Sequence, residues 1–396
     1  MKNYKYIIIG GGMTGSAALM GIRKNDPSET IAVFSSEAYP PYNRPPLSKG
    51  LWGKMKVADI MRPIDKYGVD LFLEDVIVSI NIDDKIITDN KNNKYGYTKL
   101  LLATGGTPNR FAGLPDEVVS FRTLDDFTHL KTLSEQSENF CVIGGGFIGS
   151  EIAAALQKNG KTVTLIFPEV GISSRIFPDD LSLFLNQYYE TQGVNVMAGS
   201  LVEKVSRGRD NFTVKVKSIG TNQLDTLVFD SVVLGIGIKP NVQLAQDAGL
   251  SVDNGIVVNE FLQTTDPNIY AAGDVANFYN VGLGKRTRAE HEDNANQMGI
   301  TAGLNMSGSQ NPYNHFPYFY SDLFDLGYEA VGEFSKDHQV IEDWIEPFKQ
   351  GTLFYMNGMQ VRGLVFWNLW GKVDEGRALI TKGDAYSEAD LKGMFQ

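Results

Sequence analysis

The sequence predicts an α/β protein with two parallel-sheet domains of one kind and a small α+β domain at its C-terminal end. The main observation is a glycine pattern that occurs twice, as GGGMTG at residues 10–15 and as GGGFIG at residues 144–149. Each copy follows a short apolar run, at residues 6–9 and 141–143, and precedes a segment of helical character. A strand, a glycine-rich turn and a helix in this order form the phosphate-binding start of a Rossmann-like dinucleotide-binding domain. The last observation is the aromatic-rich composition of the chain's end.

The three glycines of such a pattern have different physical roles. The first permits a tight turn, the second lets the backbone approach a pyrophosphate, and the third lets the helix pack on the strand. The helix N-terminus then presents free N–H groups to the phosphates. One copy alone could be an ordinary turn, but two copies in matched settings predict two bound dinucleotides, of which a flavin and a nicotinamide are the common pair.

The first domain is expected to begin the chain. Residues 6–9 and 30–34 predict neighbouring strands, and Glu37 follows the second of them. An acidic residue roughly 20 positions beyond the glycine loop commonly binds a ribose, and an insertion at residues 25–29 accounts for the longer spacing here. Alternating runs between residues 69 and 88 predict a small antiparallel layer, and residues 100–103 predict a buried strand.

The pattern begins again near residue 121. A linking helix leads into the second strand, glycine loop and helix. Further strands are expected at residues 162–167, 213–216, 226–229, 232–234 and 269–272, with an amphipathic helix at 179–192, and the end of the chain predicts strands at 351–355 and 361–367 and a helix at 375–380. We therefore expect a discontinuous FAD-binding domain (1–122 and 243–310), an NAD-binding domain (123–242) and a C-terminal α+β domain (311–396).

The composition excludes several kinds of protein. An apolar fraction of 42% and a charged fraction of 21% are typical of a soluble globular chain, and no apolar run approaches the roughly 18 residues of a membrane helix. A net charge of −11 argues against nucleic-acid binding. The four histidines lack metal-ligand spacing, so no metal is expected. Because the first apolar run starts so close to Met1, we expect no signal or transit peptide and a cytoplasmic location.

The chain has one cysteine, Cys141. It excludes an intrachain disulfide and a Cys-x-x-Cys pair. Since it opens the strand before the second glycine loop, we expect it to be buried and unreactive.

The segment YNRPPLSK at residues 42–49 holds two cations in a loop stiffened by prolines. Arg44 suits a pyrophosphate because its planar fork binds two oxygens at once, and Lys49 is a compact point charge that could face a flavin ring. Taken alone, the segment could also be a solvated basic loop.

Several motifs occur in a familiar order: the first glycine loop, RPPLSK at 44–49, ATG at 103–105, the second glycine loop and AGD at 272–274. In this order the chain resembles the two-dinucleotide flavoprotein reductases of the pyridine nucleotide-disulfide oxidoreductase superfamily, which have the glutathione-reductase-like fold. Within them it is most similar to the branch of apoptosis-inducing factors and ferredoxin-reductase-like proteins. The motifs SDL at 321–323, GYEA at 327–330 and FWN at 366–368 extend the likeness to the last domain.

The resemblance implies an FAD site drawn from many parts of the chain. The residues that match it are Gly10, Gly12, Met13, Thr14, Gly15, Glu37, Arg44, Lys49, Ile77, Ala103, Thr104, Gly105, Arg122, Gly273, Asp274, Glu290, His291 and Trp367. Two positions beside the matching motifs depart from the pattern of apoptosis-inducing factor and its relatives. Glu292 follows His291 where that factor has a second histidine, and Tyr320 precedes the SDL motif where many relatives have a tryptophan.

The resemblance also implies an NADH site around the second glycine loop, at Gly144, Gly146, Phe147, Ile148, Gly149, Glu151, Glu169, Gly237 and Glu290. In this family the positions of Lys49 and Glu151 form an ion pair beside the flavin, so these two are the expected catalytic residues. NADH is expected to be preferred over NADPH because a carboxylate at Glu169 would repel a 2′-phosphate, although Arg175 lies near in the sequence.

The expected function is an FAD-dependent NADH oxidoreductase that passes a hydride from NADH to FAD and electrons to an acceptor. A ferredoxin- or rubredoxin-type protein, a quinone and oxygen all remain open as acceptors, as does a homodimer. A disulfide or peroxide reductase would need a cysteine near the flavin, and residues 39–49 contain none. A redox-sensing interaction protein with slow NADH oxidation is the alternative from another class.

Overall fold

The computed structural model describes every residue from Met1 to Gln396. The chain divides into two compact units, and both are discontinuous in sequence. Unit 1 comprises Met1–Arg44, Lys56–Thr107 and Lys239–Phe319, and unit 2 comprises Pro45–Met55, Pro108–Ile238 and Tyr320–Gln396. The division into three domains stays a prediction. No helix has the length and apolar character needed to cross a membrane.

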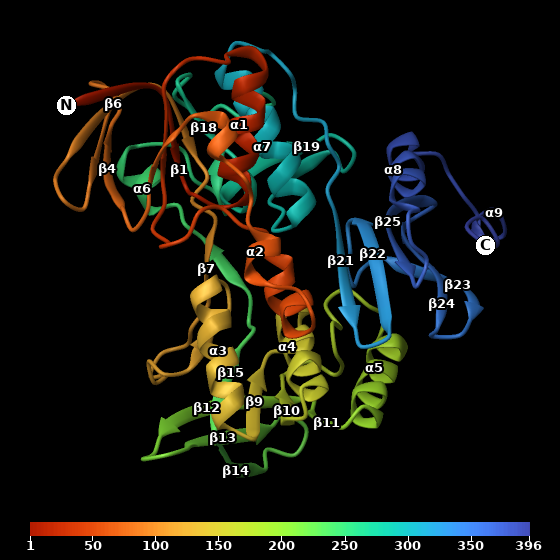
Figure 1. Cartoon of the computed structure of the whole chain (residues 1–396). Coiled ribbons are helices and arrows are strands. Elements are labelled where there is room, and N and C mark those ends of the chain that lie inside the picture. The colour runs from red at the N-terminus through yellow and green to blue at the C-terminus, as the bar shows by residue number, and fades with distance from the viewer. The chain divides into compact units, whose positions relative to one another are not determined.

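A mostly parallel sheet forms the centre of unit 1 (Figure 1). In it β1 (Lys2–Ile9) pairs in parallel with β2 (Ile31–Phe34) and with β6 (Lys94–Leu102). Beyond these, β3 (Asp70–Phe72) pairs with β2, and β18 (Ile269–Ala271) pairs with the end of β6. The antiparallel β5 (Ile86–Asp89) pairs with the start of β6, and β4 (Ile77–Asn81) pairs with β5 at the edge of the sheet. The expected antiparallel layer was wrong in one part, because residues 70–72 pair in parallel with β2.

Two long helices of unit 1, α1 (Met13–Asn25) and α7 (Glu292–Met306), lie side by side (Figure 1). Glycines permit their close approach: a methyl group on Gly303 would lie 2.1 Å from the Ala18 carbonyl oxygen. This contact fixes α1 and therefore the glycine loop that precedes it. The smaller elements are α2 (Val57–Ile60), α6 (Gln243–Asp247), β17 (Ile256–Val257), β19 (Ala276–Asn280), β20 (Lys285–Thr287) and the 3₁₀ helices η3 (Asp65–Tyr67) and η4 (Gly273–Val275).

Unit 2 contains a second parallel sheet, with strand order β11-β10-β9-β15-β8. Its strands are β8 (Val119–Ser120), β9 (Asn139–Ile143), β10 (Thr162–Ile166), β11 (Val194–Met197) and β15 (Ser231–Leu234), and its helices are α3 (Leu124–Gln136), α4 (Phe147–Lys158) and α5 (Asp179–Thr191). A separate antiparallel sheet consists of β12 (Ser200–Arg207), β13 (Phe212–Ser218) and β14 (Leu224–Phe229). β12 was not predicted from the sequence, because a register shift between Val202 and Lys204 interrupts its alternation of apolar and polar residues.

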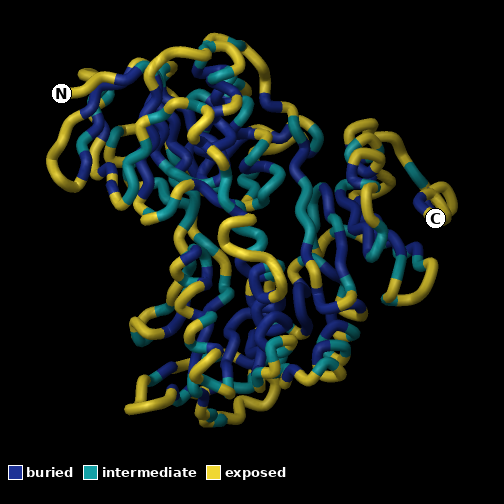
Figure 2. Tube along the Cα trace, in the orientation of Figure 1, coloured by how far each residue is buried: buried dark blue, intermediate teal, exposed yellow.

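The end of the chain forms an antiparallel sheet in the order β21-β22-β25-β24-β23. The strands are β21 (Tyr318–Leu323), β22 (Leu326–Gly332), β23 (Gln339–Glu346), β24 (Gln350–Asn357) and β25 (Gln360–Trp367), followed by α8 (Val373–Lys382) and α9 (Glu388–Leu391). The two predicted strands correspond to β24 and β25, and the other three were missed. In Figure 2 the buried residues of each unit lie along the strands of its sheets and also along helices such as α1 and α4. The remaining short elements are β7 (Gly106–Pro108), β16 (Ile238–Pro240), η1 (Pro45–Ser48) and η2 (Gly50–Trp52).

Candidate functional site

The first glycine loop joins β1 to α1 and contains glycines with different surroundings. A methyl group on Gly10 would lie 2.1 Å from the Ala103 carbonyl oxygen, and one on Gly15 would lie 2.1 Å from the Gly10 carbonyl oxygen. A methyl group on Gly12 would have a single atom within 4 Å, a nitrogen of Arg44 at 3.9 Å. Protein packing therefore demands the outer two glycines, whereas the middle glycine faces open space beside a cation.

The second glycine loop, between β9 and α4, repeats this arrangement. A methyl group on Gly144 would lie 2.5 Å from the Gly235 carbonyl oxygen, one on Gly149 would lie 1.8 Å from the Gly144 carbonyl oxygen, and one on Gly146 would meet no atom within 4 Å. Neither α1 nor α4 has a side-chain cap, so their first N–H groups are directed at whatever occupies the open space. Both loops thus fit a bound pyrophosphate.

Around the first loop, unit 1 places Arg44 against Glu37. An Arg44 nitrogen lies 2.5 Å from Glu37 Oε1, and Tyr42 donates its hydroxyl hydrogen to the same carboxylate. Burial disfavours the Arg44 cation, but the interactions with Tyr42 and with the negatively charged Glu37 outweigh this effect and raise the pKa of Arg44. Arg44, predicted at the pyrophosphate of FAD, and Glu37, predicted at its ribose, therefore form one charged cluster.

The other predicted FAD residues of unit 1 lie at strand ends and on α7. Gly273 and Asp274 begin the turn after β18, and a methyl group on Gly273 would lie 2.2 Å from Thr14 Oγ1. The stretch Ala103, Thr104 and Gly105 follows β6, while Ile77 is buried at the start of β4. Met13 is buried in the first turn of α1.

The N-terminus of α7 carries the last predicted FAD residues of unit 1. His291 occupies the N-cap position of α7 without a capping hydrogen bond from its side chain, and its ring stacks on Phe319 with centroids 4.5 Å apart. Burial lowers the pKa of His291 to about 4, although Asp274 and Asp293 attract a proton. Glu290 forms an ion pair with Arg288.

Unit 2 contains the most tightly connected polar cluster, centred on the buried carboxylate of Glu151 on α4. Lys49 forms an ion pair with it, Ser48 Oγ donates to Oε2 at 2.5 Å, and Ser321 Oγ donates to Oε1 at 2.6 Å. Lys49 also lies 3.7 Å from Asp322 and 5.4 Å from the centre of the Tyr320 ring. The predicted pair is thus observed, and the two serines and Asp322 are partners that sequence reasoning missed.

The segment Pro45–Met55 holds Lys49 in this cluster because it packs within unit 2. Trp52 is buried, donates its indole N–H to the Leu47 carbonyl oxygen at 2.9 Å, and contacts Phe127 of α3 edge to face. The segment follows Arg44 directly in sequence, yet Arg44 lies in unit 1. The two cations of the YNRPPLSK segment therefore lie in different units.

One predicted FAD residue, Trp367, requires correction. It has no exposed surface, stacks on Tyr328 with ring centroids 5.7 Å apart, meets Phe177 edge to face, and donates its N–H to the Phe348 carbonyl oxygen. A side chain without exposed surface has none with which to contact a cofactor. Trp367 belongs to an aromatic core.

Four of the other predicted NADH residues, Phe147, Ile148, Glu169 and Gly237, follow strands of the parallel sheet of unit 2, whereas Glu290 lies in unit 1. Phe147 and Ile148 open α4, and Ile148 is 38% exposed. Glu169 follows β10 and forms an ion pair with Arg175, with Nη2 2.6 Å from Oε1. Gly237 follows β15 with a φ of +87°, which favours glycine. Arg122, predicted to bind FAD, lies between β8 and α3, and its backbone N–H binds Asp126.

Several known proteins are similar to this chain. Residues 4–299 match the family model described as pyridine nucleotide-disulphide oxidoreductase. The chain is 34% identical to apoptosis-inducing factor 1, mitochondrial, of Dictyostelium discoideum, over 96% of this chain and 79% of that protein. It is 31% identical to the 5,5′-dehydrodivanillate O-demethylase ferredoxin reductase subunit of a Sphingobium species, over 98% of this chain and 97% of that protein. The solved ferredoxin reductase for the CYP199A2 system from Rhodopseudomonas palustris superimposes with a TM-score of 0.90 at 26% identity, over 99% and 98% of the two chains.

Proposed function

Because this chain belongs to the pyridine nucleotide-disulphide oxidoreductase family and is an FAD-dependent NAD(P)H oxidoreductase, we propose that it oxidises NADH and passes the electrons to a small iron–sulfur protein of the ferredoxin type. The observation that carries this proposal is the nature of its only cysteine. Cys141 is fully buried in β9, and burial raises its thiol pKa. The chain therefore has no dithiol through which electrons could leave, and an acceptor has to take them from the flavin directly.

The choice of a protein acceptor is supported by the relatives. The Sphingobium ferredoxin reductase subunit matches this chain over 97% of its own length. Because the chain has a net charge of −11, it repels an acidic partner except where cations gather on its surface, so docking depends on such local cations.

In unit 1, the residues beside the first glycine loop fit FAD. Gly12 leaves its backbone open to a pyrophosphate, and Arg44 brings the cation nearest to that space. In this proposal Arg44 exchanges part of its contact with Glu37 for the phosphates, which frees Glu37 to accept hydrogen bonds from a ribose.

In unit 2, Gly146 leaves its backbone open to the pyrophosphate of NADH, and Glu169 selects against NADPH. The ion pair with Arg175 partly neutralises Glu169 and weakens the selection. The ratio of kcat/KM with NADH to kcat/KM with NADPH should therefore fall in Glu169→Ala and rise in Arg175→Ala. Equal ratios in all three proteins would contradict this role.

We assign Lys49 the electrostatic role at the flavin and Glu151 the role of orienting it. When bound, FAD would supply a hydride acceptor for a reduced nicotinamide and a donor of electrons for the next acceptor. A unit charge about 4 Å away contributes on the order of 4 kcal/mol at an effective dielectric constant near 20, before desolvation. Ser48 and Ser321 fix the position of the Glu151 carboxylate by donating hydrogen bonds to it, which keeps Lys49 in one position.

A panel of acceptors tests the proposal. The FAD-loaded chain is reduced anaerobically with NADH and then mixed with a ferredoxin, a rubredoxin, a quinone or oxygen. We expect reoxidation by the ferredoxin to be at least about tenfold faster than by the others at equal concentration. Slow reoxidation by every acceptor would instead favour the redox-sensing alternative, which the 34% identity to apoptosis-inducing factor 1 supports.

A further inference from the structure

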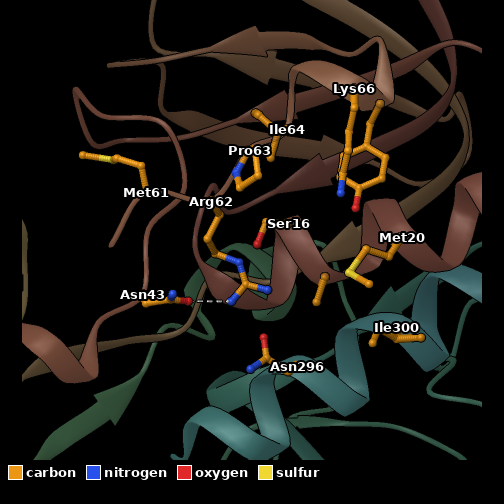
Figure 3. A pocket seen from close by; sticks show the side chains of 12 residues that line it. Ser16, Met20, Asn43, Met61, Arg62, Pro63, Ile64, Lys66, Asn296 and Ile300 are labelled. Carbon is orange, nitrogen blue, oxygen red and sulfur yellow. Dashed lines mark hydrogen bonds between the residues drawn. The ribbon is translucent and has the colours of Figure 1, made fainter. Parts of the chain in front are cut away.

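A cavity of about 430 Å³ lies in unit 1 beside the helices α1 and α7. Figure 3 shows Met20 of α1, Ile300 of α7 and the segment 61–66 around it. None of its lining residues belongs to the FAD or NADH sites proposed above. Its size falls within the range of small-molecule pockets.

Arg62 is the main charge in this cavity. A guanidinium has five donors, yet the side chain of Arg62 makes a single hydrogen bond, from Nη1 to Asn43 Oδ1 at 3.1 Å, and no ion pair. Burial lowers the pKa of Arg62, and only the attraction of Glu292, which does not line the cavity, and of Tyr67 opposes this effect. No carboxylate lines the cavity, whereas Lys66 adds a second cation. A half-buried guanidinium with unused donors is suited to bind an oxyanion.

Asn296 requires a hydrogen-bond donor from a ligand, whereas Arg62 requires an acceptor. Its Oδ1 is buried and has no hydrogen-bond partner, a condition that costs free energy unless a donor arrives. Figure 3 shows the Asn296 amide and the Arg62 guanidinium pointing toward one another across the cavity. A ligand that lies between them would have to accept from Arg62 and donate to Asn296. Met20, Met61 and Ile300 provide an apolar wall beside these polar groups.

We propose that this cavity binds a small organic carboxylate that has a hydroxyl group next to the carboxylate and an apolar body. The carboxylate accepts hydrogen bonds from Arg62, the hydroxyl donates to Asn296 Oδ1, and the apolar body packs on Met20 and Ile300. The ligand is also linked to the flavin site through Asn43, because this residue is bound by Arg62 and precedes Arg44 in the chain.

The test titrates the FAD-loaded chain with three related probes by calorimetry. Mandelate has the carboxylate, the hydroxyl and the ring; phenylacetate lacks the hydroxyl; 1-phenyl-1,2-ethanediol lacks the charge. We expect mandelate to bind at one site per chain, phenylacetate to bind about fivefold more weakly and the diol at least about tenfold more weakly. Arg62→Met should weaken mandelate binding at least about tenfold, and Asn296→Leu should abolish the preference for mandelate over phenylacetate.

Lys24→Met is the matched control, because Lys24 is an exposed cation near the end of α1 that does not line the cavity. It should leave mandelate binding unchanged. If Arg62→Met does not fold, Arg62→Lys keeps the charge without the planar fork and should still weaken binding. The proposal is wrong if mandelate does not bind saturably, if Arg62→Met and Arg62→Lys bind it as the wild type does, or if the diol binds equally well. Binding of inorganic phosphate alone, or an effect of Arg62→Met only on an acidic protein partner, would also overturn it.

Discussion

At the scale of single residues, the two glycine loops separate the needs of folding from those of binding. The first and third glycines of each loop lie so close to backbone atoms that no side chain would fit there, whereas Gly12 and Gly146 face open space. The same substitution should therefore have opposite effects at neighbouring positions.

Gly146→Ala should fold with nearly unchanged stability but raise the Kd for NADH at least about tenfold, because the methyl group occupies the space of the pyrophosphate. Gly149→Ala is the matched control: its methyl group would lie 1.8 Å from the Gly144 carbonyl oxygen, so it should lower the free energy of unfolding by about 3 kcal/mol or more. Denaturant unfolding and NADH titration measure the two effects. The account fails here if Gly146→Ala binds NADH normally.

Lys49 and Glu151 should act as a unit. Residues in direct contact show interaction energies of about 0.5–3 kcal/mol in double-mutant cycles, so Lys49→Met and Glu151→Gln should be non-additive in the rate of flavin reduction. Lys49→Met should also lower the flavin midpoint potential while FAD stays bound. Ser321→Ala should reproduce part of the Glu151→Gln effect, whereas Ser335→Ala, at an exposed turn, should have none. Additive rates with an unchanged potential would reduce the pair to a structural ion pair.

The sequence was sufficient for residues whose role depends on local pattern, such as the loop glycines. It was insufficient for partners brought together by the fold. Ser48 and Ser321 lie far apart in the chain and converge on Glu151 only because the segment Pro45–Met55 and β21 pack beside α4. Trp367 was misassigned because its neighbours in the motif do not reveal that β25 directs it into the core.

At the scale of elements, the strands with a continuous apolar run were predictable, whereas β12 and β23 were not. β1, β9, β10 and β18 are such runs buried within their sheets. β12 and β23 contain register shifts that break the period-two pattern, and residues 70–72 gave no signal for a parallel partner.

The packing of β23 against α5 contains a carboxyl pair that makes stability depend on pH. Burial raises the pKa of Glu342 on β23, and the negative charge of Asp180 on α5 adds to this, against the hydrogen bond from Trp344. A pKa that is higher in the folded than in the unfolded state gives stability at low pH that is lost as the pH rises through the folded value.

Glu342→Gln should therefore be more stable than the wild type at pH 7 to 8, and the difference should disappear toward pH 4. For a chain of 396 residues, a difference of about 1 kcal/mol would appear as a shift of roughly 1 °C in Tm, so denaturant unfolding measures it better. The control is Glu346→Gln, whose carboxylate is exposed and paired with Lys349, and which should change little at any pH. A wild-type stability that rises relative to Glu342→Gln with pH would contradict the assignment.

At the scale of the whole molecule, each unit brings one glycine loop, and the segment Pro45–Met55 gives unit 2 the cation expected beside the flavin. The fold class and the family were predictable because the motifs occur in order along nearly the whole chain. The acceptor was not, because a partner is selected by surface charges that come from several segments.

The central claim is that NADH reduces FAD bound to this chain. Anaerobic rapid mixing of the FAD-loaded protein with NADH, followed at the flavin absorbance near 450 nm, measures it directly. The account predicts complete loss of this absorbance with one equivalent of NADH, at a rate at least about tenfold greater than with NADPH at equal concentration. A chain that takes up no FAD, or a bound flavin that NADH does not reduce, would contradict it.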